Sequence, residues 1–261
     1  MIDTNEPAGW RELQDRVACI LHEAGVVTAV EKVIQTARGK VSIDVWAHDP
    51  SATPTQTYLV ECKRWRSRVS QAVVHAFRTV VGDSGANWGA IIAATGFQKG
   101  ARVAAEYTNV RLLSWTEFET LFAERWFSNY FVRKIAEATD PLVEYTEPIN
   151  SRIFRKADML PKRRRREFKR LRNMHFTLGS LCMLYRASAI GAFQAVFGVD
   201  AATRMPSLPL REILGAHVQA RDMSIADEIL DAPSYRSLFE SIVHEAQGAI
   251  AQFDDVFGER A

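Results

Sequence analysis

The sequence predicts an α/β domain, with a mixed β-sheet flanked by helices, followed by an all-α domain. Helical and strand periodicities alternate up to about residue 125, and strand signals nearly vanish beyond that point. Of the 261 residues, 47% are apolar and 25% are charged, which is typical of a soluble protein able to bury a real core. Collagen-like, low-complexity and largely disordered chains are therefore excluded.

The first half has the order αβββαβαβ. The first helix places Leu13, Val17, Ile20 and Leu21 at helical spacing and stops at Gly25, where glycine favours a left-handed cap. Two β-branched runs around Arg38-Gly39 predict a hairpin, and a proline-bearing loop separates it from the next strand. The predicted strands cover 26–35, 40–48, 58–63, 88–95 and 109–115. Helices are predicted over 10–24, over 69–85 and from 116 onward, and the segment 96–109 is predicted to be a turn into a short helix.

The second half predicts helices separated by proline-bearing turns. We expect a first domain over 1–137, a linker over 138–152 and a helical domain over 153–261. The stretch Phe176–Val199 is long enough to span a bilayer, but Arg186 would lie near its centre at a cost of about 2.5 to 3.5 kcal/mol. A buried bundle helix is the preferred interpretation, and no membrane partner is expected.

Cysteine usage indicates a reducing, cytoplasmic setting. Cys19, Cys62 and Cys182 are odd in number, widely spaced and not in CxxC pairs, so neither a disulfide framework nor a cysteine zinc site is predicted. The N-terminus carries early acidic residues and lacks the apolar stretch of a secretory signal, so we expect no export.

Three side chains in adjacent predicted strands carry the chemistry: Asp44 in one strand, and Glu61 and Lys63 in the next. Side chains on a strand alternate, so Glu61 and Lys63 share a face, and Asp44 reaches that face if the strands are neighbours. Two carboxylates suit Mg²⁺, and an ammonium beside them suits phosphodiester hydrolysis by a metal-activated water. The alternative is a plain salt bridge between Glu61 and Lys63 on an exposed strand.

The region 10–118 resembles the Mrr-like restriction endonuclease family, within the PD-(D/E)xK nuclease superfamily. The stretches that carry the resemblance occur in order: WRELQDRVACIL, ARGKVSIDVW, YLVECKRW, VSQAVVHAF, GAIIAATGFQKGARVAA and NVRLLSWTEF. The resemblance implies a restriction-endonuclease-like fold, Asp44 and Glu61 as metal ligands, and Lys63 as the catalytic lysine. It further implies that the carbonyl of Cys62 completes the metal site.

Four further residues near these strands are candidates. In similar nucleases an acidic residue on the first helix often faces the metal, which makes Glu12 a candidate, with Asp15 and Glu23 as competing surface acids. Family members frequently place a glutamine near the active site, which points to Gln71 on the next helix. His75 lies one turn further and is more often structural in such a position. Lys99 near a helix N-terminus could meet a phosphate or simply be solvated.

A basic block distinguishes the start of the second half. Residues 152–172 contain 11 Lys/Arg and 2 Asp/Glu, whereas 173–261 contain 6 and 11. Such asymmetry favours a polyanionic partner with salt-dependent, sequence-independent affinity. The alternative is a helix that solvates its charge or packs against the acidic region that follows. The predicted nucleic-acid-binding residues are Lys162, Arg163, Arg164, Arg165, Arg166, Lys169 and Arg170.

These observations predict a Mg²⁺-dependent DNA endonuclease, with Mn²⁺ as a possible substitute and no small-molecule cofactor. The resemblance further implies restriction, phage defence or DNA repair, and a homodimer is plausible because cutting both strands generally takes two active sites. The main rival is a nucleic-acid-binding or regulatory module that keeps the fold but does not cut. A third hypothesis makes the C-terminal half a membrane or oligomer anchor.

Overall fold

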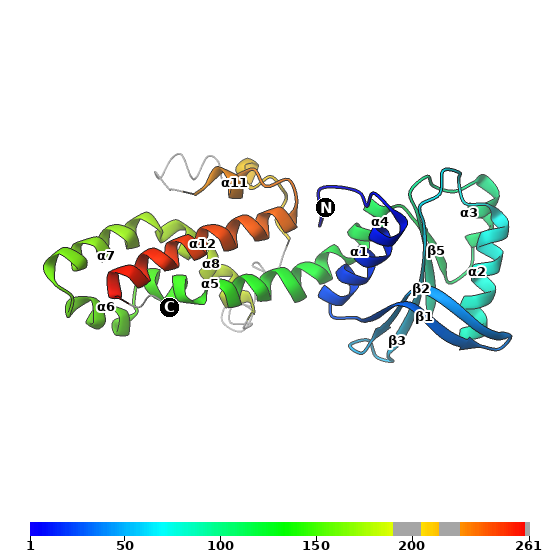
Figure 1. Cartoon of the computed structure of the whole chain (residues 1–261), viewed down its shortest axis with the longest axis horizontal. Coiled ribbons are helices and arrows are strands. Elements are labelled where there is room, and N and C mark those ends of the chain that lie inside the picture. Colours follow the sequence, from blue (N-terminus) through cyan, green and yellow to red (C-terminus); the bar gives the residue numbers. More distant parts are fainter. Residues whose placement is uncertain (190–204, 214–224, 259–261) are drawn as a thin grey trace. The chain divides into compact units, whose positions relative to one another are not determined.

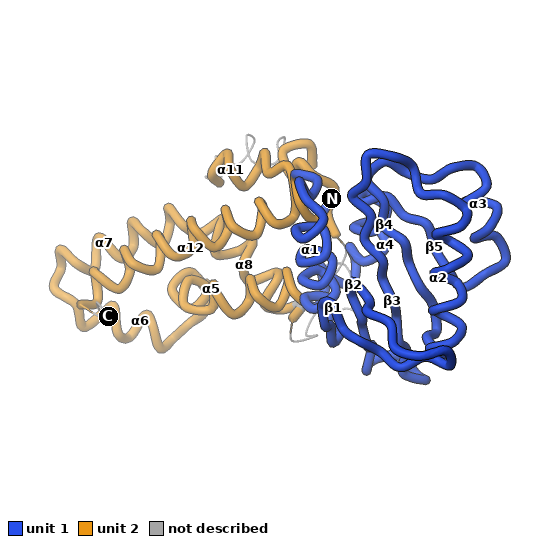
Figure 2. Tube along the Cα trace, turned by 45° about the vertical axis from the view of Figure 1, so that its right-hand side comes forward, with its two compact units in different colours: residues 1, 5–129 blue, residues 2–4, 130–261 orange. Residues whose placement is uncertain are grey.

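The computed structural model describes residues 1–189, 205–213 and 225–258 (Figure 1). The chain forms two compact units (Figure 2). Unit 1 comprises residues 1 and 5–129, and unit 2 comprises residues 2–4 and 130–261.

Unit 1 has the element order expected from the sequence, which confirms the mixed α/β class. Its helices are α1 (Trp10–Glu23), α2 (Gln71–Ser84), α3 (Lys99–Ala105) and α4 (Trp115–Trp126). Its strands are β1 (Val27–Thr36), β2 (Gly39–Asp49), β3 (Gln56–Lys63), β4 (Trp88–Ala93) and β5 (Val110–Leu113). Helix α1 ends where predicted, because Gly25 adopts φ 83°, which a glycine reaches at no steric cost.

The five strands form one sheet in the order β1-β2-β3-β4-β5. Strands β1, β2 and β3 pair antiparallel, and β3, β4 and β5 pair parallel. Helices α1 and α4 cover one face and α2 and α3 cover the other (Figure 1). Leu59 and Ile91 face the α2 side in a core with Phe77, so the alternation of a strand turns Cys62 toward the opposite face.

A buried ion pair ties the end of β2 to α4. Asp49 is 2% exposed, and the guanidinium of Arg125 donates to both of its carboxylate oxygens. Ser51 Oγ and the Tyr58 hydroxyl also donate to this carboxylate, at 2.8 and 2.9 Å. The hydrogen bond from Arg125 is the main reason that the pKa of Asp49 lies well below its usual value, and burial raises the pKa of Tyr58 to about 12.

Among the residues that the structure describes, the regular elements of unit 2 are helices joined by turns and loops, as predicted for the second half. Its helices are α5 (Val132–Thr146), α6 (Ser151–Asp158), α7 (Lys162–Met174), α8 (Phe176–Ala189), α11 (Asp227–Leu230) and α12 (Tyr235–Phe257). Helix α5 packs against α8 and α12, where Tyr145 stacks on Phe253 at 4.7 Å. The predicted bundle helix over 176–199 extends outside the described residues. Within the described part of the chain, no helix is long and apolar enough to cross a membrane.

The unit boundary differs from the boundary expected from the sequence. Unit 1 ends at Asn129, inside the π-helical segment η1 (Phe127–Phe131), whereas we expected the first domain to reach residue 137. The expected linker over 138–152 is mostly helix, because α5 continues through Pro141 to Thr146. Pro141 lies on the exposed side, and the burial of Leu142 and Val143 directly after it offsets the loss of one backbone hydrogen bond.

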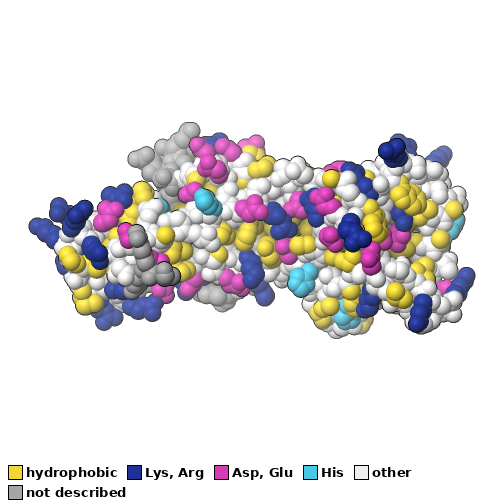
Figure 3. All heavy atoms as spheres, in the orientation of Figure 1, with side chains coloured by type: hydrophobic (Ala, Val, Ile, Leu, Met, Phe, Trp, Pro, Cys, Tyr) yellow, Lys and Arg dark blue, Asp and Glu magenta, His cyan; other side chains and the backbone are white. Residues whose placement is uncertain are grey.

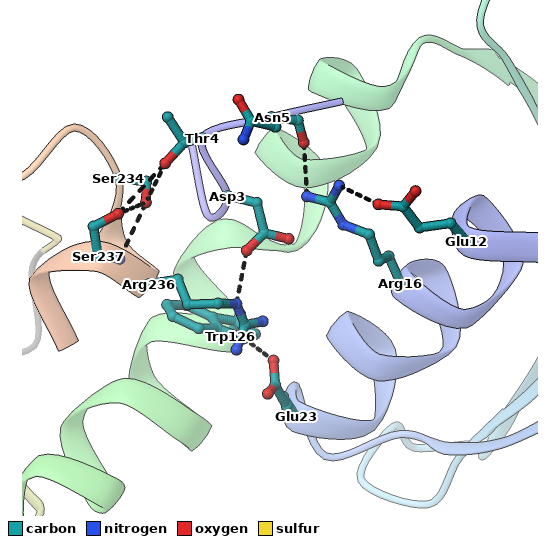
Figure 4. Close-up of polar contacts among 10 residues, drawn as sticks. All are labelled: Asp3, Thr4, Asn5, Glu12, Arg16, Glu23, Trp126, Ser234, Arg236 and Ser237. Atoms are coloured by element: carbon teal, nitrogen blue, oxygen red, sulfur yellow. Dashed lines mark hydrogen bonds and ion pairs between the residues drawn. The ribbon is translucent and has the colours of Figure 1, made fainter. Parts of the chain in front are cut away.

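The first residues of the chain pack on the last helix of unit 2 (Figure 4). The side chain of Ile2 is fully buried, and its carbonyl accepts the backbone N–H of Arg236 at 3.0 Å. Asp3 pairs with the Arg236 side chain at 2.7 Å, and Thr4 Oγ1 bonds Ser234 Oγ at 3.2 Å. The chain therefore passes between the units at three points, after Met1, after Thr4 and after Asn129.

We predict that Asp49→Asn lowers the free energy of unfolding of unit 1 by roughly 2 to 4 kcal/mol at neutral pH, because it leaves a half-buried guanidinium without its anion. A carboxyl group whose pKa is lower in the folded than in the unfolded state stabilises the fold at pH values above its unfolded pKa of about 4. This stabilisation is lost as the pH falls from there through the pKa of the folded state. The difference between wild type and variant should therefore shrink below about pH 4. All six tryptophans lie in unit 1, so tryptophan fluorescence during denaturant unfolding reports on this unit.

Asp83→Asn is the matched control, because Asp83 pairs at 2.9 Å with an Arg38 side chain that is largely exposed. This substitution should change the free energy of unfolding by less than about 1 kcal/mol. Equal effects of the two substitutions would contradict a stabilising role for the buried pair.

Candidate active site

The carboxylate of Asp44 lies where strands β2 and β3 stop pairing. The paired residues of β2 and β3 run from Asp49 with Gln56 to Val45 with Val60. Continuing this register by one residue puts Asp44 opposite Glu61. Beyond that pair, Asp44 Oδ2 accepts the backbone N–H of Cys62 at 2.7 Å. A charge-assisted hydrogen bond from a side chain thus takes over from the ladder and fixes the carboxylate beside β3.

The neighbouring strand is distorted at the same level of the sheet. Glu31 of β1 lies between the pairs Val30–Val45 and Lys32–Ile43, and it adopts φ 51°. This left-handed conformation costs a non-glycine residue about 1 to 3 kcal/mol and often accompanies functional sites. The strain in β1 thus lies beside Asp44.

The second oxygen of Asp44 is held from helix α1. Gln14 Nε2 donates to Asp44 Oδ1 at 3.1 Å, and Gln14 itself is 1% exposed. Gln14 shares the buried face of α1 with Val17, Ala18 and Leu21, so the packing of that face sets the position of its amide. Asp44 Oδ2 is therefore held by the backbone of β3, and Oδ1 is held by a side chain of α1.

Glu61 and Lys63 point to the same face of β3, as the alternation predicts. The Lys63 ammonium pairs with Glu61 Oε1, and both side chains are mostly buried. The same ammonium lies 4.9 Å from the centre of the Trp65 ring, within the range of a cation–π interaction. Glu61, Lys63 and Trp65 line one cavity of about 280 Å³ between the sheet and α2.

Burial controls the electrostatics of this group. The pKa of Glu61 is raised, mainly by burial and also by the nearby charge of Asp44, while the hydrogen bond from Lys63 opposes the shift. Burial also raises the pKa of the Cys62 thiol well above its usual value, so this side chain stays neutral. Glu61 and Asp44 are thus close enough for their charges to interact, and a cation between them would relieve this repulsion.

The oxygen atoms gathered here are of the kind that a hard divalent cation prefers, but the protein offers few of them. Asp44 and Glu61 offer carboxylate oxygens, and Cys62 has its backbone carbonyl between them in sequence. Among the residues that the structure describes, no group of three or more His, Cys, Asp or Glu side chains could hold a metal ion. A cation bound here would retain several water molecules, as Mg²⁺ commonly does.

Glu12 is not brought to this group. Its carboxylate accepts the backbone N–H of Ala8 at 2.8 Å and pairs with Arg16 at 3.4 Å (Figure 4). Glu12 and Gln14 are two positions apart on α1, so they project in different directions and only Gln14 reaches Asp44. Asp15 is exposed, and Glu23 accepts a hydrogen bond from the Trp126 indole.

Gln71 and His75 lie in the first two turns of α2. Their side chains are bonded to each other at 3.1 Å, and Gln71 packs against Gly100, where an added Cβ would lie 2.8 Å from Gln71 Oε1. His75 lines a separate cavity of about 520 Å³ with Arg78 and Tyr107. Lys99 is exposed at the first position of α3. Gln71 thus contacts His75 and Gly100, and it is not among the residues that line the cavity of Glu61 and Lys63.

The basic residues of α7 divide into two groups. Arg165 donates to the carbonyls of Asp158 and Leu160, while Arg172 lies 4.7 Å from the Phe154 ring and donates to a carbonyl. Exposed side chains form the second group, which contains Lys162, Arg163, Arg164, Arg166, Lys169 and Arg170. Of these six, Arg170 pairs with Glu167 at 2.6 Å. The expected binding residue Arg165 is thus directed at the backbone of its own chain.

Sequence reasoning missed Gln14 and Trp65. The signal for Gln14 was present, because a polar side chain on the apolar face of a helix must find a partner inside the fold. The signal for Trp65 was its position two residues after Lys63, which continues the face of β3 into the following loop.

A family model matches most of unit 1. Residues 6–122 match the family model Mrr_cat, described as restriction endonuclease. No curated protein matches the chain. The crystal structure of a protein of unknown function, AF1548, aligns with 97% of this chain and 100% of that chain, at 15% sequence identity and a TM-score of 0.35.

We predict that Gln14→Leu weakens Mn²⁺ or Mg²⁺ binding by about 10- to 100-fold, because it removes the group that orients a ligand carboxylate. The apolar core around α1 is kept, so thermal unfolding without metal should change little. Calorimetric titration of the two variants Gln14→Leu and Glu12→Gln with Mn²⁺ provides the measurement. If Glu12→Gln weakens binding and Gln14→Leu does not, Glu12 is the functional residue of α1, as the sequence resemblance implied.

Proposed function

We propose, from the match of residues 6–122 to the restriction endonuclease family model, that the protein is a Mg²⁺-dependent DNA endonuclease. The observation that carries the proposal is the convergence of Asp44, Glu61 and Lys63 at the end of the β2–β3 pairing. Two carboxylates and one ammonium held together by three elements of the fold are more than a surface salt bridge requires. This convergence favours cleavage over the rival of a non-cutting DNA-binding module.

Asp44, Glu61 and the carbonyl of Cys62 would hold Mg²⁺, or Mn²⁺ in its place. When bound, the ion would supply positive charge that stabilises the phosphate and acidifies a water molecule. Lys63 would donate hydrogen bonds to a phosphate oxygen or orient the attacking water, since its ammonium is kept in place by Glu61 and the Trp65 ring. Gln14 would keep Asp44 in the geometry that binding needs.

Helix α7 would supply affinity for the DNA backbone. Its exposed arginines Arg163, Arg164 and Arg166 line a groove of about 770 Å³ together with Arg170. Dark blue side chains gather at the end of unit 2 where α6 and α7 lie (Figure 3). Contacts of this kind neutralise phosphates without reading sequence, so they would add affinity to any DNA. Lys162, Lys169 and, in unit 1, Lys99 remain candidates for the same role.

We further propose a cytoplasmic role in restriction, phage defence or DNA repair. A homodimer would supply the two active sites that double-strand cleavage generally takes. Sedimentation velocity with and without DNA tests the assembly, and digestion of supercoiled, linear and methylated DNA tests the substrate.

We predict that Glu61→Gln and Lys63→Met each lower the cleavage rate by at least about 100-fold, because one removes a metal ligand and the other a group that acts on the phosphate or water. Cleavage of supercoiled DNA, measured with Mg²⁺ and with EDTA, checks this. DNA affinity in EDTA should change little, since the bulk of it would come from α7.

Lys40→Met is the control for removal of a lysine from the sheet, because Lys40 is exposed near the β1–β2 turn. It should cleave like the wild type. Wild-type protein that binds DNA but cleaves no form of it with Mg²⁺ or Mn²⁺ would favour the non-cutting module instead.

We predict that neutralising Arg163, Arg164 and Arg166 together to glutamine weakens DNA binding and lowers the slope of log K against log salt by about 0.9 for each phosphate that is no longer neutralised. Fluorescence anisotropy at several salt concentrations measures both. The matched variant Arg165→Gln should keep the slope and instead lower thermal stability, since Arg165 bonds the backbone of its own chain. An unchanged slope in the triple variant would assign α7 to structure alone.

A further inference from the structure

The cavity beside Glu61 and Lys63 has a character that phosphate chemistry does not explain. Its wall is mostly apolar and comes from β2 and α2, with Val41, Ile43, Val73, Ala76, Phe77 and Val80 as the lining residues. A phosphate gains little from such a wall, since it carries charge that only polar or cationic groups stabilise. The apolar part of the cavity is therefore suited to a different portion of the substrate.

Trp65 forms the exposed rim of this cavity. Its side chain is 44% exposed, although a tryptophan gains much from burial. It follows β3 directly, and its ring contacts the Lys63 ammonium. A flat aromatic surface thus stands open to solvent next to the group that would act on the phosphate.

We propose that this cavity binds one unpaired nucleobase of the DNA substrate, stacked on Trp65 and placed next to the phosphate that is cut. The proposal rests on the function proposed above. A nucleobase is the flat, largely apolar part of DNA, and stacking on aromatic side chains is how proteins hold bases that have left the duplex.

With a base in this cavity, the cleavage rate depends on whether the DNA at the cut is paired or unpaired. A base inside a duplex must be unstacked and unpaired before it can enter, and this penalty is smallest for mismatched or single-stranded DNA. The protein therefore cuts single-stranded, mismatched or frayed DNA at least about tenfold faster than a perfect duplex of the same sequence.

The test measures the environment of one base directly. Full-length protein in EDTA is titrated with a short single-stranded DNA that contains one 2-aminopurine, whose fluorescence responds to stacking. Trp65→Ala should abolish the fluorescence change and weaken binding by about 5- to 150-fold, the factor for one stacked base, and Trp65→Phe should keep most of both.

Two further variants separate the cavity from its surroundings. Trp10→Ala removes a tryptophan that is 39% exposed at the start of α1 and does not line the cavity, so it should behave like the wild type. Ala76→Trp starts from an exposed position on α2 and fills the cavity while keeping Trp65, so it should weaken base binding as Trp65→Ala does.

The outcomes distinguish this inference from the proposed function. If no DNA is cut by any variant, the endonuclease proposal fails, but the 2-aminopurine titration still decides whether a base enters the cavity. If Trp65→Ala and Ala76→Trp give the same fluorescence change as Trp10→Ala, the base site does not exist. A loss of cleavage in Trp65→Ala that is equal for duplex and single strands, with base binding intact, would leave Trp65 only the role of positioning Lys63.

Discussion

The candidate active site depends on one contact, the hydrogen bond from the Cys62 backbone to the Asp44 carboxylate. It joins β2 to β3 at the level where β3 presents Glu61 and Lys63, and Gln14 adds a second restraint from α1. A helix and two strands thus converge on a single side chain. Without this contact, Glu61 and Lys63 would form only an ion pair on a strand, which is the alternative that the sequence leaves open.

The sequence could predict the strand-borne part of this site because the period of a strand is two. Alternation fixes the relative faces of Glu61 and Lys63, and the loop over 50–55 lets β2 and β3 pair as antiparallel neighbours. The helix-borne part depends on how α1 is rotated against the sheet. The resemblance pointed to Glu12, whereas Gln14 lies on the buried face of α1 with Leu13 and Val17 and is the residue that reaches Asp44.

The same limit applies to the second half of the chain. The charge count predicts a basic helix, but it treats Arg165 and Arg166 alike, whereas the helix turns one toward backbone carbonyls and leaves the other exposed. Proline signals predict a linker around Pro141, yet the burial of Leu142 and Val143 maintains the helix through it. Local propensity was outweighed by tertiary packing that a single sequence does not display.

The proposed chemistry requires that Asp44 and Glu61 share one divalent cation next to Lys63. Anomalous diffraction from crystals of the protein soaked in Mn²⁺ would locate this ion, because Mn²⁺ scatters anomalously and replaces Mg²⁺ at oxygen sites. We expect a peak bounded by these two carboxylates and the Cys62 carbonyl, and its loss in Glu61→Gln crystals. A well-diffracting soaked crystal with no peak at this position, or with a peak held by other residues, would rule out the shared cation.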